Sequence, residues 1–196
     1  MKDILFNALS KIEHQFNKDE LTYLQITSKI EHSIRDKLAY YLHCHENELT
    51  ISREWHRVDL AILKDDTPIA LIELKSMYTG NFLSKTDKDK FAKYLKDDVD
   101  KNIKKYPDIP VYIILLATNI LTEIPLPYKS YIKYPSIINR PFKNGKSIEE
   151  NTALFRRYAT EILPSKNFKH LKIISESAFD IKSELLIWLC GPFYSK

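Results

Sequence analysis

The sequence predicts an α/β protein in which a mixed central sheet is flanked by helices. Two short apolar runs joined by a polar turn, at 58–64 and 68–76, indicate an antiparallel pair of strands. The charged amphipathic segment 84–106 follows them and indicates a crossover helix. The almost wholly apolar run 111–120 then has the composition of a strand buried on both faces, which is typical of the centre of such a sheet.

The remaining elements of the first 120 residues complete this arrangement. Helical periodicity predicts helices over 3–17 and 28–43, and residues 49–55 predict a first strand. The "DDTP" sequence between the two apolar runs has the residues that turns require. The predicted order is therefore helix, three antiparallel strands, helix and strand.

The ends of the later helices carry recognisable signals. Thr86 is the expected N-cap of the 84–106 helix, in which acids follow in the first turn and lysines stand near the end, as the helix dipole favours. A second helix is predicted over 147–163, where Ser147 and Glu150 have the spacing of a capping box.

We expect a single domain over residues 1–196, with a core at about 25–120 and a C-terminal α+β extension over 121–196. Within the extension, the proline-rich segment 124–146 predicts a long ordered loop, and two late strands are predicted over 171–179 and 183–193.

Composition excludes several classes of site. Three glycines cannot supply a glycine-rich phosphate loop or a dinucleotide fingerprint. Two distant cysteines cannot form a four-cysteine zinc or iron–sulfur site. The charged N-terminus and the lack of an 18-residue apolar run lead us to expect a soluble, cytoplasmic protein without membrane contact.

Charge is distributed unevenly along the chain. Residues 1–120 contain 18 Lys/Arg and 19 Asp/Glu, whereas residues 121–196 contain 12 and 7. A basic final third on a nearly neutral first part suggests one positive face.

Charged residues interrupt the two apolar runs where a strand built only for packing would avoid them. Glu73 and Lys75 share one face of the second strand, and their apolar neighbours take the other. A hairpin that turns within "DDTP" places Asp59 opposite Glu73, so the three side chains should converge. A register slip of one residue would turn Asp59 to the other face.

Such a trio suits the hydrolysis of a phosphodiester. Two neighbouring carboxylates repel each other and are costly to bury, and a divalent cation removes that penalty. Mg²⁺ binds one or two carboxylates together with waters and a substrate phosphate, and it activates the bound water. Lys75 is placed to orient that water and to stabilise the transition state. The alternative is an exposed ion pair on an edge strand, which would contribute little.

The pattern "VD…ELK" within the order α-β-β-β-α-β resembles the PD-(D/E)xK nuclease superfamily, which has the restriction-endonuclease-like fold. The resemblance covers roughly residues 25–120, and Val58 stands where the family name has proline. It implies that Asp59, Glu73 and the main-chain carbonyl of Leu74 are metal ligands, and that Lys75 is the catalytic lysine. It also implies Mg²⁺ as the cofactor, with Mn²⁺ able to substitute.

Two further acids are candidates near this site. Members of the superfamily often bring a glutamate from the first core helix to the metal, and Glu31 lies inside the apolar arc of the 28–43 helix. The alternative for Glu31 is an ion pair with Arg35 one turn later. Glu54 is either an acid that supports the site or an ordinary exposed strand residue.

Several basic and aromatic residues are candidates for nucleic-acid contacts. In related nucleases the helix after the motif borders the substrate backbone, and residues 128–172 contain ten Lys/Arg against three acids, interleaved with aromatics. Basic residues bind phosphates, and aromatics stack on exposed bases. The expected contacts are Arg57, Lys90, Tyr94, Lys129, Lys133, Arg140, Lys143, Arg156 and Arg157.

We therefore expect a Mg²⁺-dependent DNA endonuclease of the restriction or defence type. A single site cuts one strand, so a homodimer is the expected form for cutting a duplex. Two alternatives remain open. One is a catalytically inactive protein of the same fold that binds DNA or another protein, and the other is a partner-dependent nuclease subunit acting on RNA or DNA.

Overall fold

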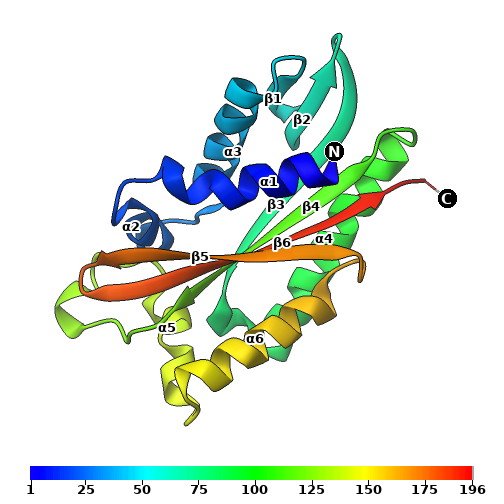
Figure 1. The fold of residues 1–196 in the computed structure, drawn as a ribbon. Coiled ribbons are helices and arrows are strands. Elements are labelled where there is room, and N and C mark those ends of the chain that lie inside the picture. The colour runs from blue at the N-terminus through cyan, green and yellow to red at the C-terminus, as the bar shows by residue number, and fades with distance from the viewer. Residues whose placement is uncertain (196) are drawn as a thin grey trace.

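The structure, a computed structural model, describes residues 1–195 and has a six-stranded sheet with helices on both of its faces (Figure 1). The strands are β1 (Thr50–Trp55), β2 (Val58–Lys64), β3 (Thr67–Tyr78), β4 (Val111–Ile120), β5 (Phe168–Ala178) and β6 (Ile181–Phe193). The α-helices are α1 (Lys2–Lys11), α2 (Glu20–Thr27), α3 (Glu31–His45), α4 (Lys85–Lys105), α5 (Pro135–Ile138) and α6 (Ile148–Ile162). Short 3₁₀ turns span Ile12–Gln15, Thr79–Leu83, Leu126–Tyr128 and Arg140–Lys143.

The sheet is mixed, which confirms the predicted α/β class. Its strand order is β1-β2-β3-β4-β6-β5. The β3–β4 pair is parallel, and the other neighbouring pairs are antiparallel. Parallel neighbours need a long crossover connection, and α4 supplies it.

Strand β4 lies at the centre of the core and is buried along its whole length, as its apolar sequence predicts. Ile114 and Leu116 pack on the face covered by α1 and α3, whereas Ile113 and Leu115 pack on the face covered by α4 and α6. Because side chains alternate along a strand, both halves of the core share this one strand. Figure 1 shows the two helical layers on opposite sides of the sheet.

The N-terminal helices differ from the prediction. The first helix ends at Lys11, and α2 was not expected. This short helix buries two polar residues as well as apolar ones, so its sequence has no regular apolar stripe. Thr22 lies 2.8 Å from the Ser183 hydroxyl, and the Gln25 side-chain carbonyl accepts a hydrogen bond from Ser183. Because hydrogen bonds to β6 allow these polar residues to be buried, α2 lacks the periodic apolar pattern that usually predicts a helix.

The helix caps are partly as predicted. Ser147 and Glu150 form the expected capping box at the start of α6. At α4 the expectation of Thr86 is wrong. Ser84 is the N-cap, and its hydroxyl accepts a hydrogen bond from the Asp87 amide at 3.2 Å. Both serines therefore satisfy an amide that the first turn of the helix leaves free.

The C-terminal part completes the central sheet rather than forming an extension of it. Strand β6 pairs with β4 from Val111↔Phe193 to Ile120↔Ser183 and thereby covers an edge that would otherwise be apolar and unpaired. The predicted loop 124–146 contains α5 and two 3₁₀ turns. It docks against the turn after β3, where the Arg140 guanidinium donates to the Gly80 carbonyl at 3.1 Å.

The backbones of Gly80 and Ile137 lie in close contact where the segment 124–146 docks. A Cβ atom at Gly80 would collide with the carbonyl oxygen of Ile137 in α5. Only glycine lets the two backbones meet there. Within residues 1–195, no helix is both long and apolar enough to cross a membrane.

We predict that Ile114→Ala lowers the free energy of unfolding by about 2–5 kcal/mol, because it leaves a cavity in the central strand. Ile114 is fully buried, whereas Ile174 in β5 is 65% exposed and offers a matched control. Ile174→Ala should change the stability by less than about 0.5 kcal/mol. Urea unfolding of both variants measures the difference, and equal losses would contradict the placement of β4.

Candidate active site on β2 and β3

The register of the β2–β3 hairpin brings Asp59 next to Glu73. Leu60 pairs with Ile72 and Ala61 with Leu71, and continuing this register by one residue sets Asp59 opposite Glu73. The Asp59 Oδ2 atom accepts a hydrogen bond from the Leu74 amide at 2.7 Å. The carboxylate of Asp59 is therefore held against the β3 backbone beside Glu73.

An irregularity in the hairpin produces this register. The turn residues Asp65 and Asp66 both have positive φ, and Lys64 pairs with Thr67 across them. A regular ladder from such a two-residue turn would set Asp59 opposite Ile72, on the wrong face. A β-bulge lies between the turn and Asp59, because Leu63 pairs with Pro68 but Ile62 pairs with Ala70. The extra residue in β3 moves Asp59 to the face of Glu73.

Glu73 is a buried carboxylate, and within residues 1–195 one side chain donates a hydrogen bond to it. Its side chain accepts a hydrogen bond from the Asn102 amide of α4 at 2.7 Å, and the residue is 4% exposed. Burial first, and then the neighbouring Asp59 and Asp98 carboxylates, raise the pKa of Glu73 to about 8, although the Asn102 bond opposes the shift.

Lys75 lies on the same face of β3 and pairs with an acid of α4. Its Nζ atom is 2.9 Å from the Asp98 carboxylate. Burial alone would lower the pKa of Lys75, but the hydrogen bond and charge of Asp98, with the charges of Glu31 and Glu73, raise it above its ordinary value. The ammonium group is therefore kept charged in a partly buried position.

Glu31 contacts the same segment of β3 from the other side. As the first residue of α3, it accepts a hydrogen bond from the Ser76 amide at 2.8 Å. The expected alternative, a pair with Arg35, is wrong, because Arg35 forms ion pairs with Glu54 and Asp36 instead. Glu54 is thus an exposed partner of Arg35.

The alternative of an ion pair on an edge strand is also wrong. Strand β3 lies between β2 and β4 in the interior of the sheet. Leu74, which separates Glu73 from Lys75, is fully buried in the opposite half of the core. Glu73 and Lys75 therefore lie on an interior strand, where burying charge is costly unless the charge is paired.

The donors present fit a hard divalent cation. Asp59 and Glu73 offer carboxylate oxygens, and within residues 1–195 no lysine or arginine forms an ion pair with Glu73, because Lys75 pairs with Asp98. The Asn102 Oδ1 atom is buried and has no hydrogen-bond partner within residues 1–195. The same residues contain no cluster of three or more His, Cys, Asp or Glu side chains suited to a metal. Two carboxylates alone would leave most positions around a Mg²⁺ ion to waters and a substrate phosphate.

A cavity of about 600 Å³ opens beside Lys75, and we call it the Lys75 cavity. Glu31 and Asp98 line it, and so do Lys90 and Tyr94, two of the predicted nucleic-acid contacts. A phosphate in this cavity would meet three lysines, Lys29, Lys75 and Lys90, on a wall that also carries four acids.

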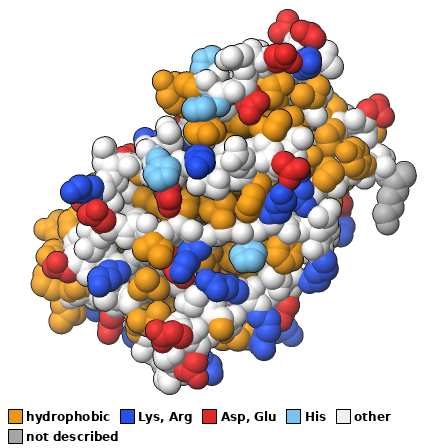
Figure 2. Space-filling view, viewed as in Figure 1, with side chains coloured by type: hydrophobic (Ala, Val, Ile, Leu, Met, Phe, Trp, Pro, Cys, Tyr) orange, Lys and Arg blue, Asp and Glu red, His pale blue; other side chains and the backbone are white. Residues whose placement is uncertain are grey.

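The other predicted nucleic-acid contacts do not gather at this cavity. Arg57 lies in the exposed β1–β2 turn, and Lys129, Lys133 and Lys143 lie along the segment 124–146. Arg140 is used to hold the Gly80 turn. Arg156 lines a separate cavity with Lys172, and Arg157 pairs with Glu161. Figure 2 shows basic side chains interspersed with acidic and apolar ones on the face drawn, rather than one positive patch.

The sequence reasoning missed two residues of α4 that contact the site. Asp98 pairs with Lys75, and Asn102 donates to Glu73. A signal was present, because both lie beside the buried Leu95 and Val99 at helical spacing. Polar residues within the buried stripe of a helix mark the place where it meets a polar group of the sheet.

Comparisons of the chain with family models, with curated proteins and with solved structures found no match. The function proposed below therefore rests on the geometry of the site.

We predict that the metal-free protein loses stability as the pH rises from about 4.5 to about 8. Over this range the folded state keeps a proton on Glu73 that the unfolded state releases, so rising pH favours unfolding. Glu73→Gln should remove this dependence and be more stable than the wild type near the upper limit, by on the order of a few kcal/mol.

Urea unfolding in EDTA at several pH values tests this expectation. Glu149→Gln, at an exposed position in the first turn of α6, is the matched control and should keep the wild-type slope. The same slope in wild type and Glu73→Gln would show that Glu73 is not protonated in the folded state.

Proposed function

We propose that the protein is a Mg²⁺-dependent DNA endonuclease with the restriction-endonuclease-like fold of the PD-(D/E)xK superfamily. The observation that carries this proposal is the hairpin register that sets Asp59 opposite Glu73, with Lys75 two residues further along the same face. The order of elements from α3 to β4, helix, three strands, helix and strand, supports the fold. A homodimer would supply the second site needed to cut both strands of a duplex.

In this proposal Asp59, Glu73 and the Leu74 carbonyl hold the metal, and Mn²⁺ can take its place. The bound metal supplies an activated water and stabilises charge on the phosphate. The residues of the chain prepare the site for it. Asn102 fixes the orientation of the Glu73 carboxylate, and the Leu74 amide fixes that of Asp59.

Lys75 contributes a positive charge where the phosphate becomes more negative. The Asp98 and Glu31 carboxylates keep its ammonium protonated, so its charge is available without a proton transfer. A fixed cation aimed at developing charge is among the largest single contributions that a protein makes to such a reaction. Glu31 also anchors β3 through the Ser76 amide and so holds Lys75 in place.

One observation favours a second candidate function, a nucleic-acid-binding protein that does not cleave. Lys75 already pairs with Asp98 at 2.9 Å, so this carboxylate offsets part of the charge that a phosphate would meet. In a non-cleaving protein the pair would be permanent and would serve the packing of α4 on β3. Binding of DNA without cleavage under Mg²⁺ or Mn²⁺ would support this alternative.

We predict that the purified protein cleaves plasmid DNA with Mg²⁺ and that EDTA abolishes the cleavage. Glu73→Ala and Lys75→Ala should each lower the rate by at least about 100-fold, because each removes a group that stabilises the transition state. Lys96→Ala is the matched control and should leave the rate unchanged. Lys96 is an exposed lysine of α4, the helix whose Asp98 contacts Lys75. Cleavage that survives EDTA and both substitutions would contradict the mechanism.

We further predict that Asp98→Asn moves the alkaline limb of the pH–rate profile to lower pH. Removing the carboxylate removes the main influence that raises the pKa of Lys75, so the ammonium loses its proton earlier as the pH rises. Asp100→Asn, two residues along α4 and exposed, is the control. A profile that does not move would show that the charge of Lys75 does not limit the rate.

A further inference from the structure

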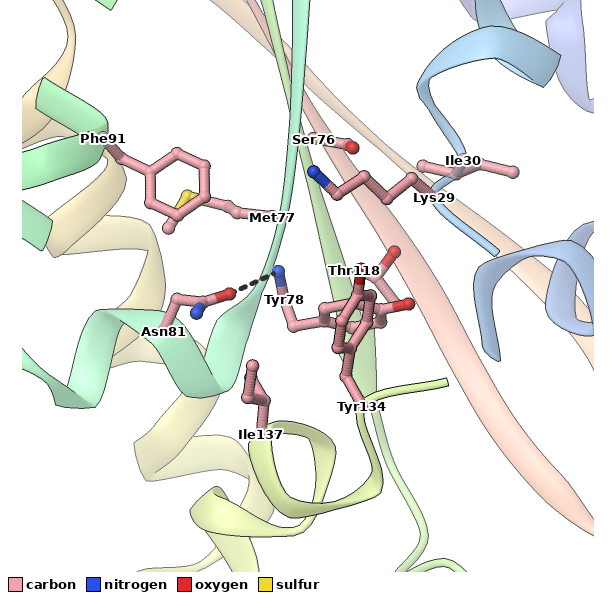
Figure 3. A pocket seen from close by; sticks show the side chains of 10 residues that line it. All are labelled: Lys29, Ile30, Ser76, Met77, Tyr78, Asn81, Phe91, Thr118, Tyr134 and Ile137. Atoms are coloured by element: carbon pink, nitrogen blue, oxygen red, sulfur yellow. Dashed lines mark hydrogen bonds between the residues drawn. The ribbon is translucent and has the colours of Figure 1, made fainter. Parts of the chain in front are cut away.

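A second cavity of about 200 Å³ adjoins the Lys75 cavity at the end of β3, and we call it the aromatic pocket (Figure 3). The two cavities share four lining residues, which lie on the wall between them. These are Lys29, Ser76, Asn81 and Phe91. A ligand could therefore extend from the aromatic pocket past these four residues to Lys75.

Aromatic rings form the sides of this pocket. Figure 3 shows Phe91 with Met77 on one side, and Tyr78 with Tyr134 on the other, above Ile137. The Tyr78 ring is held in place because its hydroxyl donates to the carbonyls of Gln25 and Ser28, at 2.9 and 3.0 Å.

Tyr134 reaches the pocket through an unusual backbone conformation. Its φ of 61° lies in the left-handed region, which is uncommon for a bulky residue and costs free energy. Its ring centroid is 5.8 Å from that of Tyr78 in an edge-to-face arrangement. A strained residue that completes a ring-lined pocket suggests that the position of the ring matters for a ligand.

A buried polar atom also points to a ligand. Ser76 is 8% exposed and lines both cavities, and its hydroxyl has no hydrogen-bond partner within residues 1–195. Buried hydroxyl groups are rarely left without a partner, because the loss of hydration is not repaid. Lys29 extends toward Ser76 in Figure 3 and adds a positive charge at the junction.

We propose that the aromatic pocket takes one unstacked nucleobase of a single-stranded or locally unpaired segment while the adjoining phosphate lies in the Lys75 cavity. This inference rests on the proposed nuclease function and names its substrate class. Aromatic rings bind bases of any sequence by stacking, and the Ser76 hydroxyl offers a polar partner at the base edge. A base within a duplex stays stacked between its neighbours and cannot enter such a pocket unless it is flipped out.

The size of the pocket agrees with a single base. Sites for drug-sized molecules usually measure roughly 300–1,000 Å³. The aromatic pocket is smaller, at about 200 Å³. It suits one ring system, with the sugar and phosphate continuing into the larger cavity beside Lys75.

Fluorescence anisotropy in EDTA tests the proposal without cleavage. The probes are a labelled single-stranded oligonucleotide and the same strand annealed to its complement. Tyr134→Asn removes the ring while keeping a residue that tolerates the left-handed backbone, and Phe91→Ala removes the opposite wall. Each should weaken single-strand binding roughly five- to 100-fold and leave duplex binding within about twofold of the wild type. Phe91→Trp should restore single-strand binding.

Tyr131→Ala is the matched control, because Tyr131 is an exposed aromatic residue of the same segment that does not line the pocket. It should bind both probes as the wild type does. Wild-type binding by Tyr134→Asn and Phe91→Ala, or equal losses on both probes, would overturn the aromatic pocket as a base site.

A parallel cleavage assay with Mg²⁺ separates this proposal from the proposed function. Lys75-dependent cleavage of the single-stranded probe that is unaffected by Tyr134→Asn would retain the nuclease and reject the base pocket. Ring-dependent binding of the single strand without cleavage under any metal would retain the pocket and reject the nuclease.

Discussion

The pairing of β2 with β3 is the constraint on which the site depends. Side chains alternate along both strands, so a shift of one residue decides whether Asp59 faces Glu73 or the apolar half of the core. The two-residue turn at Asp65 and Asp66 favours the unproductive register, and the bulge that leaves Ile69 as the extra residue restores the productive one. One unpaired residue therefore determines whether the two acids meet.

Helix α4 reduces the free-energy cost of burying charged groups beside Asp59 and Glu73. Asn102 donates to the buried Glu73, and Asp98 holds the charge of Lys75. The site is nevertheless left with an excess of negative charge, which adds to the effect of burial in raising the pKa of Glu73 and which suits a cation. Glu31 adds to this excess from α3, so three elements that are distant in sequence supply charge to one short stretch of β3.

Much of the sheet and the central trio could be predicted from local patterns, because strand alternation and the long apolar run of β4 are visible in the sequence. The pairing of Asp59 with Glu73 was predicted from a turn centred on residue 66, whereas the turn is centred between Asp65 and Asp66 and the bulge supplies the difference. The pairing of β6 with β4, the helix α2 and the contacts of α4 depend on long-range pairing and on buried polar bonds. Local periodicity does not indicate the β6–β4 pairing or α2, and it shows only that Asp98 and Asn102 lie on the buried side of α4.

The backbone contact between Gly80 and Ile137 has a consequence for how the protein could diverge. Gly80 belongs to the turn after β3, and Ile137 forms the base of the aromatic pocket. Any side chain at position 80 would act as a wedge that lifts α5 from the sheet and reshapes the pocket, without touching an acid or the lysine. Under the proposed function, a single glycine would link the choice of substrate to a position away from the acids and the lysine, where a substitution would alter selectivity and leave those groups in place.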